Sequence, residues 1–141
     1  MRKITPLAAA LLALAIPSTA TAKNFKQSGY VVGDKAATVK LRVKASGARA
    51  VKVGGFKAKN VRAKCKTKEI RIQLTALEPV PVARDGGFSV RLGDGAGGVL
   101  KISGQVLDGG RATKGSIKTN EFQEGDDTCR VAKQKFKTSV R

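Results

Sequence analysis

Short segments in which apolar and polar residues alternate one by one recur along most of this chain. A period of two places every second side chain on one face of an extended strand, so that each segment can bury one face and expose the other. The clearest examples are residues 38–45, 69–74, 88–92 and 100–106. Weaker examples lie near residues 51–53, 61–65, 117 and 136. Since no stretch after residue 23 has a convincing helical period, the pattern predicts an all-β protein.

Turn sequences separate these predicted strands. They are Ser46-Gly47, Gly54-Gly55, Asp85-Gly86-Gly87, Gly93-Asp94-Gly95 and Asp108-Gly109-Gly110. We interpret Asp85, Asp94 and Asp108, each followed by glycine, as turn residues rather than as catalytic or metal-binding groups. About eight or nine short strands, each with one apolar face, predict an antiparallel β-sandwich. A small closed β-barrel with a ligand cavity is the alternative.

The first 22 residues predict an export signal. A positively charged start is followed by an apolar run over residues 7–16, which is too short to span a bilayer because spanning needs about 20 residues. The small residues 18–22 then end in Ala-x-Ala. We expect cleavage after Ala22, which leaves one domain over residues 23–141 in a secreted protein, extracellular or periplasmic, with no transmembrane segment. A buried or anchoring helix is the alternative interpretation.

Cys65 and Cys129 are the two cysteines of the chain. In the oxidising surroundings of an exported protein they predict one disulfide. Two free structural thiols are the alternative, and a redox pair is disfavoured because the spacing differs from Cys-x-x-Cys. Closing a loop of about 65 residues stabilises a fold by roughly 4 kcal/mol in the chain-entropy model. That is a large contribution for a chain with 4% aromatic residues.

Several short motifs follow one another in the mature chain. They are Gly29-Tyr30 before the first strands, Cys65 before an apolar strand, Asp85-Gly86-Gly87-Phe88-Ser89, Ile102-Ser103-Gly104-Gln105-Val106, and Cys129 before an aromatic-bearing terminal strand. In this combination the chain resembles a class of small exported bacterial two-cysteine β-sandwich proteins of uncharacterised function. In that class the last strand often contains Trp, where this chain has Phe136. The resemblance implies a two-sheet architecture and carries over no functional residues.

The positive charge of the chain is unevenly distributed. The sequence has 28 Lys and Arg against 10 Asp and Glu, a formal net charge of +18. Residues 23–71 contain 15 basic and 2 acidic residues, and residues 129–141 contain 5 basic and none acidic, whereas residues 72–128 contain 6 basic and 8 acidic. The predicted disulfide joins the two basic flanks, because bonded cysteines have Cα atoms within about 7 Å.

We therefore predict one contiguous basic patch. It consists of Lys57, Lys59, Arg62, Lys64, Lys66, Lys68, Arg130, Lys133, Lys135 and Lys137. Such a patch predicts an exported binding or accessory protein for polyanions: an envelope polymer, nucleic acid bound without sequence specificity, or anionic lipid headgroups. One alternative is a structural envelope protein whose charge serves solubility and keeps its edge strands unpaired. Another is a barrel that carries a small apolar ligand.

Composition argues against catalysis and against most metal sites. The absence of His removes Ser-His and Cys-His pairs and the commonest transition-metal ligand. Two cysteines cannot form a four-thiolate zinc site. We predict a protein that is not an enzyme and has no cofactor and no metal. Calcium binding and pairing with nearby lysines are both open interpretations of one acidic cluster. The cluster consists of Glu121, Glu124, Asp126 and Asp127.

Overall fold

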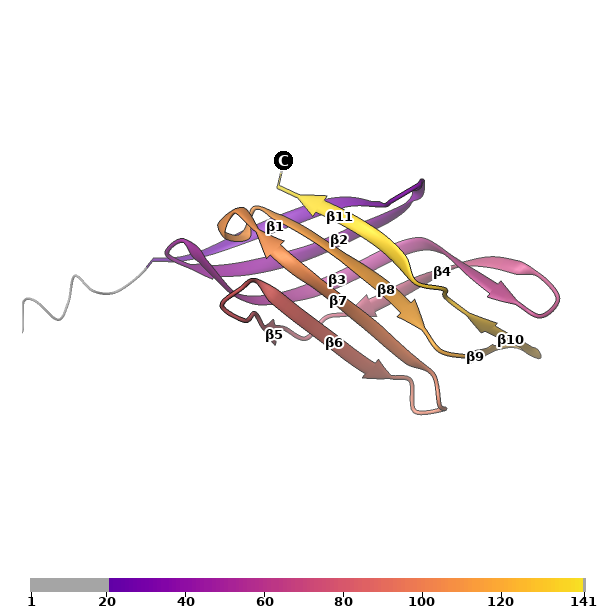
Figure 1. The fold of residues 1–141 in the computed structure, drawn as a ribbon. Coiled ribbons are helices and arrows are strands. Elements are labelled where there is room, and N and C mark those ends of the chain that lie inside the picture. The colour runs from indigo at the N-terminus through magenta and orange to yellow at the C-terminus, as the bar shows by residue number, and fades with distance from the viewer. Residues whose placement is uncertain (1–20, 141) are drawn as a thin grey trace, which may run out of the picture.

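The computed structural model describes residues 21–140, and strands form nearly all of its regular structure (Figure 1). The strands are β1 (Ala22–Val31), β2 (Asp34–Ser46), β3 (Arg49–Cys65), β4 (Glu69–Ala76), β5 (Val80–Pro81), β6 (Gly87–Gly93), β7 (Val99–Leu107), β8 (Ala112–Thr119), β9 (Phe122–Glu124), β10 (Asp127–Arg130) and β11 (Gln134–Ser139). One 3₁₀ turn, η3 (Asp108–Gly110), follows β7. The predicted all-β class is confirmed. The predicted export signal lies outside the described residues, except for its last two positions.

All eleven strands belong to one antiparallel sheet. The order runs β6-β7-β8-β11-β1-β2-β3. The long strand β3 pairs on one edge with β2 and, near its end, with β10, which in turn pairs with β9. On its other edge β3 pairs with β4 and β5. Within the described range the sheet is open, because β6 and β4 at its two ends do not pair with each other. The closed barrel is therefore wrong. The strand count exceeds the predicted eight or nine, because β5, β9 and β10 are too short to show alternation.

The sheet curls strongly around its apolar side. Phe56 on β3 meets Phe136 on β11 edge to face, with 5.7 Å between ring centroids. Two strands, β1 and β2, separate β3 from β11, so a flat sheet would place them about 14 Å apart at the usual strand spacing. The curl also brings β6, β7 and β8 over β3 and β4, as Figure 1 shows. The buried residues lie on the inner side of this curl.

The alternation predicted over residues 38–45 is confirmed. Val39, Leu41, Val43 and Ala45 are buried, and the three basic residues between them are exposed. The prediction is less accurate at the end of β6, where Leu92 is 48% exposed although it follows the apolar period. Leu92 lies at the open side of the sheet, where no strand continues the pairing. The period thus predicts which face is apolar but not whether another strand covers it.

Two phenylalanines cover two glycines on the inner face. Phe88, Gly104, Gly115 and Phe136 lie directly opposite one another across β6, β7, β8 and β11. A Cβ atom at Gly115 would lie 2.8 Å from Cζ of Phe136, and one at Gly104 would lie 2.9 Å from Cζ of Phe88. The glycines therefore provide the space that the aromatic rings fill.

We expect Gly115→Ala to destabilise the fold by about 1–3 kcal/mol, because the added methyl would lie too close to the ring of Phe136 and to the carbonyl oxygen of Ser103. The matched control is Gly93→Ala in β6, where the nearest atom to a Cβ is 3.8 Å away. Urea unfolding of both variants measures the effect. Equal stability of the two variants would contradict this account of the glycine pair.

The disulfide between Cys65 and Cys129 is confirmed. The two residues are directly paired across β3 and β10, with 3.9 Å between Cα atoms. Only one further residue pair, Lys64 with Arg130, joins these strands. Beyond β3, the backbone N–H of Lys66 also donates to the oxygen of Thr128 at 3.1 Å, so the disulfide is the covalent part of a short attachment of the β9–β10 hairpin. In the described part of the chain no helix is long and apolar enough to cross a membrane.

We expect the double variant Cys65→Ala/Cys129→Ala to lose roughly 4 kcal/mol of stability in the chain-entropy model. Because few backbone pairs remain, the amide hydrogen of Arg130 should exchange faster in the variant than in the unmodified protein, whereas those of the β7–β8 pair should change less. Denaturant unfolding and hydrogen exchange measure the two effects. Unchanged exchange at Arg130 would show that the hairpin is held without the disulfide.

Candidate anion-binding site

Four basic side chains form a row across β6, β7, β8 and the residue that precedes β11. Arg91 on β6 lies directly opposite Lys101 on β7, which lies directly opposite Lys118 on β8. Gln134 pairs with Ile117, so Lys133, one residue before β11, lies beside Lys118. All four side chains are exposed on the outer face. We call Arg91, Lys101, Lys118 and Lys133 the basic row.

The alternation of side chains along the strands and the turn at Asp94 together determine the position of the basic row. Ile102 and Ile117 are buried on the inner face, so the adjacent Lys101 and Lys118 must point outward. The β6–β7 register is set by a turn in which Oδ1 of Asp94 accepts the N–H groups of Ala96 at 2.7 Å and Gly98 at 2.9 Å. The prediction that Asp94 is a turn residue agrees with these bonds.

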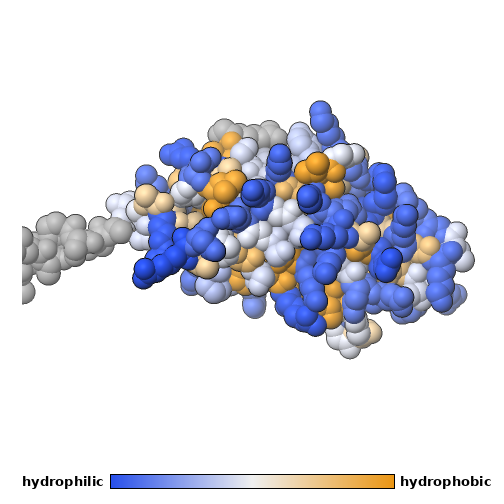
Figure 2. Space-filling view, viewed as in Figure 1, coloured by the Kyte–Doolittle hydropathy of each residue, from blue (hydrophilic) through white to orange (hydrophobic). Residues whose placement is uncertain are grey.

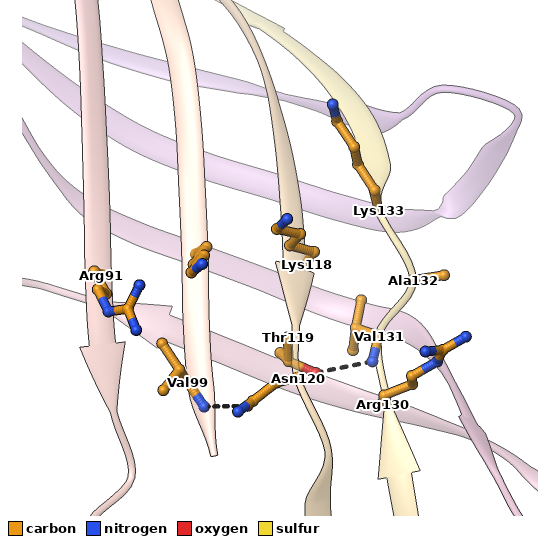
Figure 3. Close-up of a pocket in the computed structure, with 10 residues that line it drawn as sticks. Arg91, Val99, Lys118, Thr119, Asn120, Arg130, Val131, Ala132 and Lys133 are labelled. Atoms are coloured by element: carbon orange, nitrogen blue, oxygen red, sulfur yellow. Dashed lines mark hydrogen bonds between the residues drawn. The ribbon is translucent and has the colours of Figure 1, made fainter. Parts of the chain in front are cut away.

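The basic row lines a hollow of about 430 Å³, shown in Figure 3. Arg130 joins the four cations, and uncharged residues complete the wall. These are Val99, Thr119, Asn120, Val131 and Ala132. The segment after β10 is held against β8, because Thr119 donates its N–H to the oxygen of Val131 at 3.0 Å and accepts the N–H of Val131 at Oγ1 at 2.9 Å. The hollow is thus lined by five cations and no carboxylate.

A second basic hollow lies on the other side of the same segment. Its volume is about 470 Å³, and Arg62, Lys64, Lys133 and Lys135 line it together with Asp34. Part of its charge is balanced, because Arg62 pairs with Glu69 at 3.1 Å. The carboxylate of Asp34 is itself bound by Arg71 at 2.7 Å. Lys133 lines both hollows and makes the two basic regions continuous.

The structure brings together half of the ten residues predicted to form the basic patch. Those that line one of the two hollows are Arg62, Lys64, Arg130, Lys133 and Lys135. The other half lies elsewhere. Lys57 and Lys59 lie opposite Lys40 and Thr38, Lys137 lies opposite Tyr30 and Lys114, and Lys66 and Lys68 belong to the turn after β3.

Arg91, Lys101 and Lys118 were not predicted to belong to the patch. They come from residues 72–128, where acidic residues outnumber basic ones. The acidic side chains Asp85, Asp94 and Asp108 lie in turns, whereas these three cations lie within strands. Each occupies an outward position of an alternating segment, so its face was predictable. Its partner across the sheet was not, because that depends on strand register.

The basic row carries concentrated positive charge. Among the described residues ion pairs form only between Arg62 and Glu69 and between Arg71 and Asp34, so no cation of the row has a carboxylate partner. Like charges directly opposite on neighbouring strands are destabilising. Figure 2 shows the face formed by β6, β7, β8 and β11, where hydrophilic side chains predominate and apolar surface is exposed between them. A bound anion would relieve the repulsion within the row.

The acidic cluster does not converge on a common point. Asp127 accepts the N–H groups of Lys66 at 3.0 Å and Thr67 at 3.3 Å, together with the hydroxyl of Thr67. The described residues contain no group of three His, Cys, Asp or Glu side chains placed to hold a metal ion. Asp127 thus ties the turn after β3 to β10.

We expect the turn that Asp127 holds to loosen in acid. The hydroxyl bond from Thr67, followed by N–H bonds from Thr67, Lys66 and Thr128, lowers the pKa of Asp127 below its usual value. A depressed pKa in the folded state means that the stabilisation is present above the unfolded pKa near 3.9 and is lost as pH falls through the folded pKa. Amide shifts of Lys66 and Thr67 followed by NMR below pH 4 measure this.

The variant Asp127→Asn serves as the control for this titration. It should remove the acid transition of the Lys66 and Thr67 amides while leaving the β7–β8 amides unchanged. A transition that persists in Asp127→Asn would assign it to another carboxylate.

No family model matches the sequence, and no curated protein and no solved structure is significantly similar to the chain. The function is therefore inferred from the chain's own charges and hollows.

Proposed function

We propose that this chain is an exported, non-enzymatic binding protein that holds polyanions on the basic row. The observation that supports the proposal most strongly is the in-register pairing of Arg91, Lys101 and Lys118, which Lys133 continues. Strands lie about 4.8 Å apart, so a linear polyanion that crosses them meets one cation at each step. The basic flank on β3 extends this path through Lys64 and Arg62.

Export belongs to the same proposal. The disulfide between Cys65 and Cys129 fits an oxidising compartment, where such bonds persist. A two-layered sandwich is the form that we propose for the curled sheet, with β6, β7 and β8 in one layer and β3 and β4 in the other. The edge-to-face contact of Phe56 with Phe136 supports such layering.

The competing function is a structural envelope protein whose charge acts only through its total amount. The chain offers a matched test, because Lys44 and Lys52 form another pair of lysines directly opposite each other, on β2 and β3. That pair does not line either basic hollow. Removing it changes the net charge by the same amount as removing Lys101 and Lys118.

We expect Lys101→Gln/Lys118→Gln to weaken the binding of single-stranded oligothymidylate, a polyanion of regular charge spacing. If both lysines contact phosphates, the slope of log K against log salt should fall in magnitude by about 1.4, since each contact to a single strand contributes about 0.7. Fluorescence anisotropy across a salt series measures the slope. Lys44→Gln/Lys52→Gln should leave it nearly unchanged, and an equal loss in both variants would favour the competing function.

A further inference from the structure

The open side of the sheet contains an apolar hollow of about 300 Å³. It lies between the two ends of the sheet, with Ile72 and Leu74 from β4 on one side and Leu92 and Leu100 from β6 and β7 on the other. Phe122 on β9 also lines it. The volume is at the lower end of the range of pockets that hold small molecules. Water reaches these side chains because β4 and β6 do not pair.

Because the sheet is open here, the apolar side chain of Leu92 remains in contact with water. Its side chain lies on the apolar face opposite Leu100, yet it is 48% exposed. Ile72, Leu74 and Phe122 are half-buried and pack against the core. An aliphatic group placed between them would remove apolar surface from water on both sides of the opening.

The apolar hollow adjoins the hollow lined by the basic row. Val99 and Thr119 line both, at the ends of β7 and β8. This end of the sheet therefore has a hollow lined by five cations on one side and an apolar opening on the other. A ligand that bends around this end of the sheet can place an anionic group against Lys101 and Lys118 and an aliphatic group against Leu92 and Leu100.

Charge orients such a ligand. Asp94 and Glu124 lie in the lining of the apolar hollow, and both are acidic. An anionic group is repelled there and attracted to the basic row, which has no carboxylate in its hollow. The aliphatic part, which carries no charge, has the opposite preference because the apolar hollow brings together Leu92, Leu100 and Phe122, whereas the hollow of the basic row is lined mainly by cations.

The geometry points to a single-chain anionic amphiphile as the ligand of this protein, with its headgroup on the basic row and its chain in the hollow between β4 and β6. This inference rests on the proposed function for its headgroup and adds the aliphatic chain. Among the anions proposed for the basic row, it favours anionic lipid headgroups over nucleic acid, because Phe122, the aromatic residue in these two hollows, lines the apolar one.

The test compares butyl phosphate with octyl phosphate at monomeric concentrations by titration calorimetry. Burial of each added methylene should strengthen binding about fourfold, so octyl phosphate should bind roughly 200-fold more tightly if all four are buried. Octyl glucoside, which has the same chain and no charge, should bind far more weakly than octyl phosphate. Equal affinity of the two phosphates, or of the two octyl compounds, would overturn the inference.

Two variant pairs separate the chain from the headgroup. Leu92→Gln should weaken octyl phosphate about tenfold and leave oligothymidylate binding unchanged, whereas Leu77→Gln, at a leucine 63% exposed outside this hollow, should change neither. Lys101→Gln/Lys118→Gln should weaken both ligands, with Lys44→Gln/Lys52→Gln as control. Binding of oligothymidylate without any chain-length effect would refute the amphiphile alone, and binding of neither probe would refute the proposed function as well.

Discussion

Direct pairing of residues across antiparallel strands determines where both the core and the charge of this chain lie. Residues opposite each other share a face, so one register places Ile102 beside Ile117 inside and Lys101 beside Lys118 outside. The registers of β6 with β7 and of β11 with β8 set the phenylalanine rings over Gly104 and Gly115. A slip by one residue would exchange the two faces and expose the isoleucines. Core packing therefore holds the basic row in place.

The cations of the basic row repel one another, and the packing of the core keeps them in place. Like charges directly opposite on neighbouring strands are unfavourable, and cross-strand pairs contribute roughly 0.2–1 kcal/mol each. The buried partners of the inner face outweigh this, because burying a side chain such as isoleucine contributes about 1.5–3 kcal/mol. The excess of positive charge on the outer face is thus a property that the core can sustain. It leaves a surface whose energy falls when an anion binds.

Some of this arrangement could be predicted from the sequence, and the reasons differ by element. The alternation around Val39 and Leu41 predicts burial directly, and two cysteines after a predicted export signal predict the bond from Cys65 to Cys129. The basic row was missed because Arg91, Lys101 and Lys118 are ten or more residues apart and lie in a stretch without excess positive charge. Only the register across β6, β7 and β8 brings them together.

The open side of the sheet could not be predicted for a related reason. The period of β6 identifies Leu92 as apolar-facing, but whether a strand covers it depends on how far the sheet curls. The curl brings Phe56 against Phe136, and a disulfide joins β10 to β3; both contacts link residues at least 64 positions apart. The proposed ligand site therefore arises from long-range contacts rather than from any local motif.

The most direct measurement of the central claim is an NMR titration of lysine side-chain signals with oligothymidylate. If the basic row is the binding site, the signals of Lys101, Lys118 and Lys133 shift first and together, while those of Lys44 and Lys52 move little. If the charge acts only through its amount, Lys44 and Lys52 shift as early and as far as the lysines of the row. That second result would contradict the account.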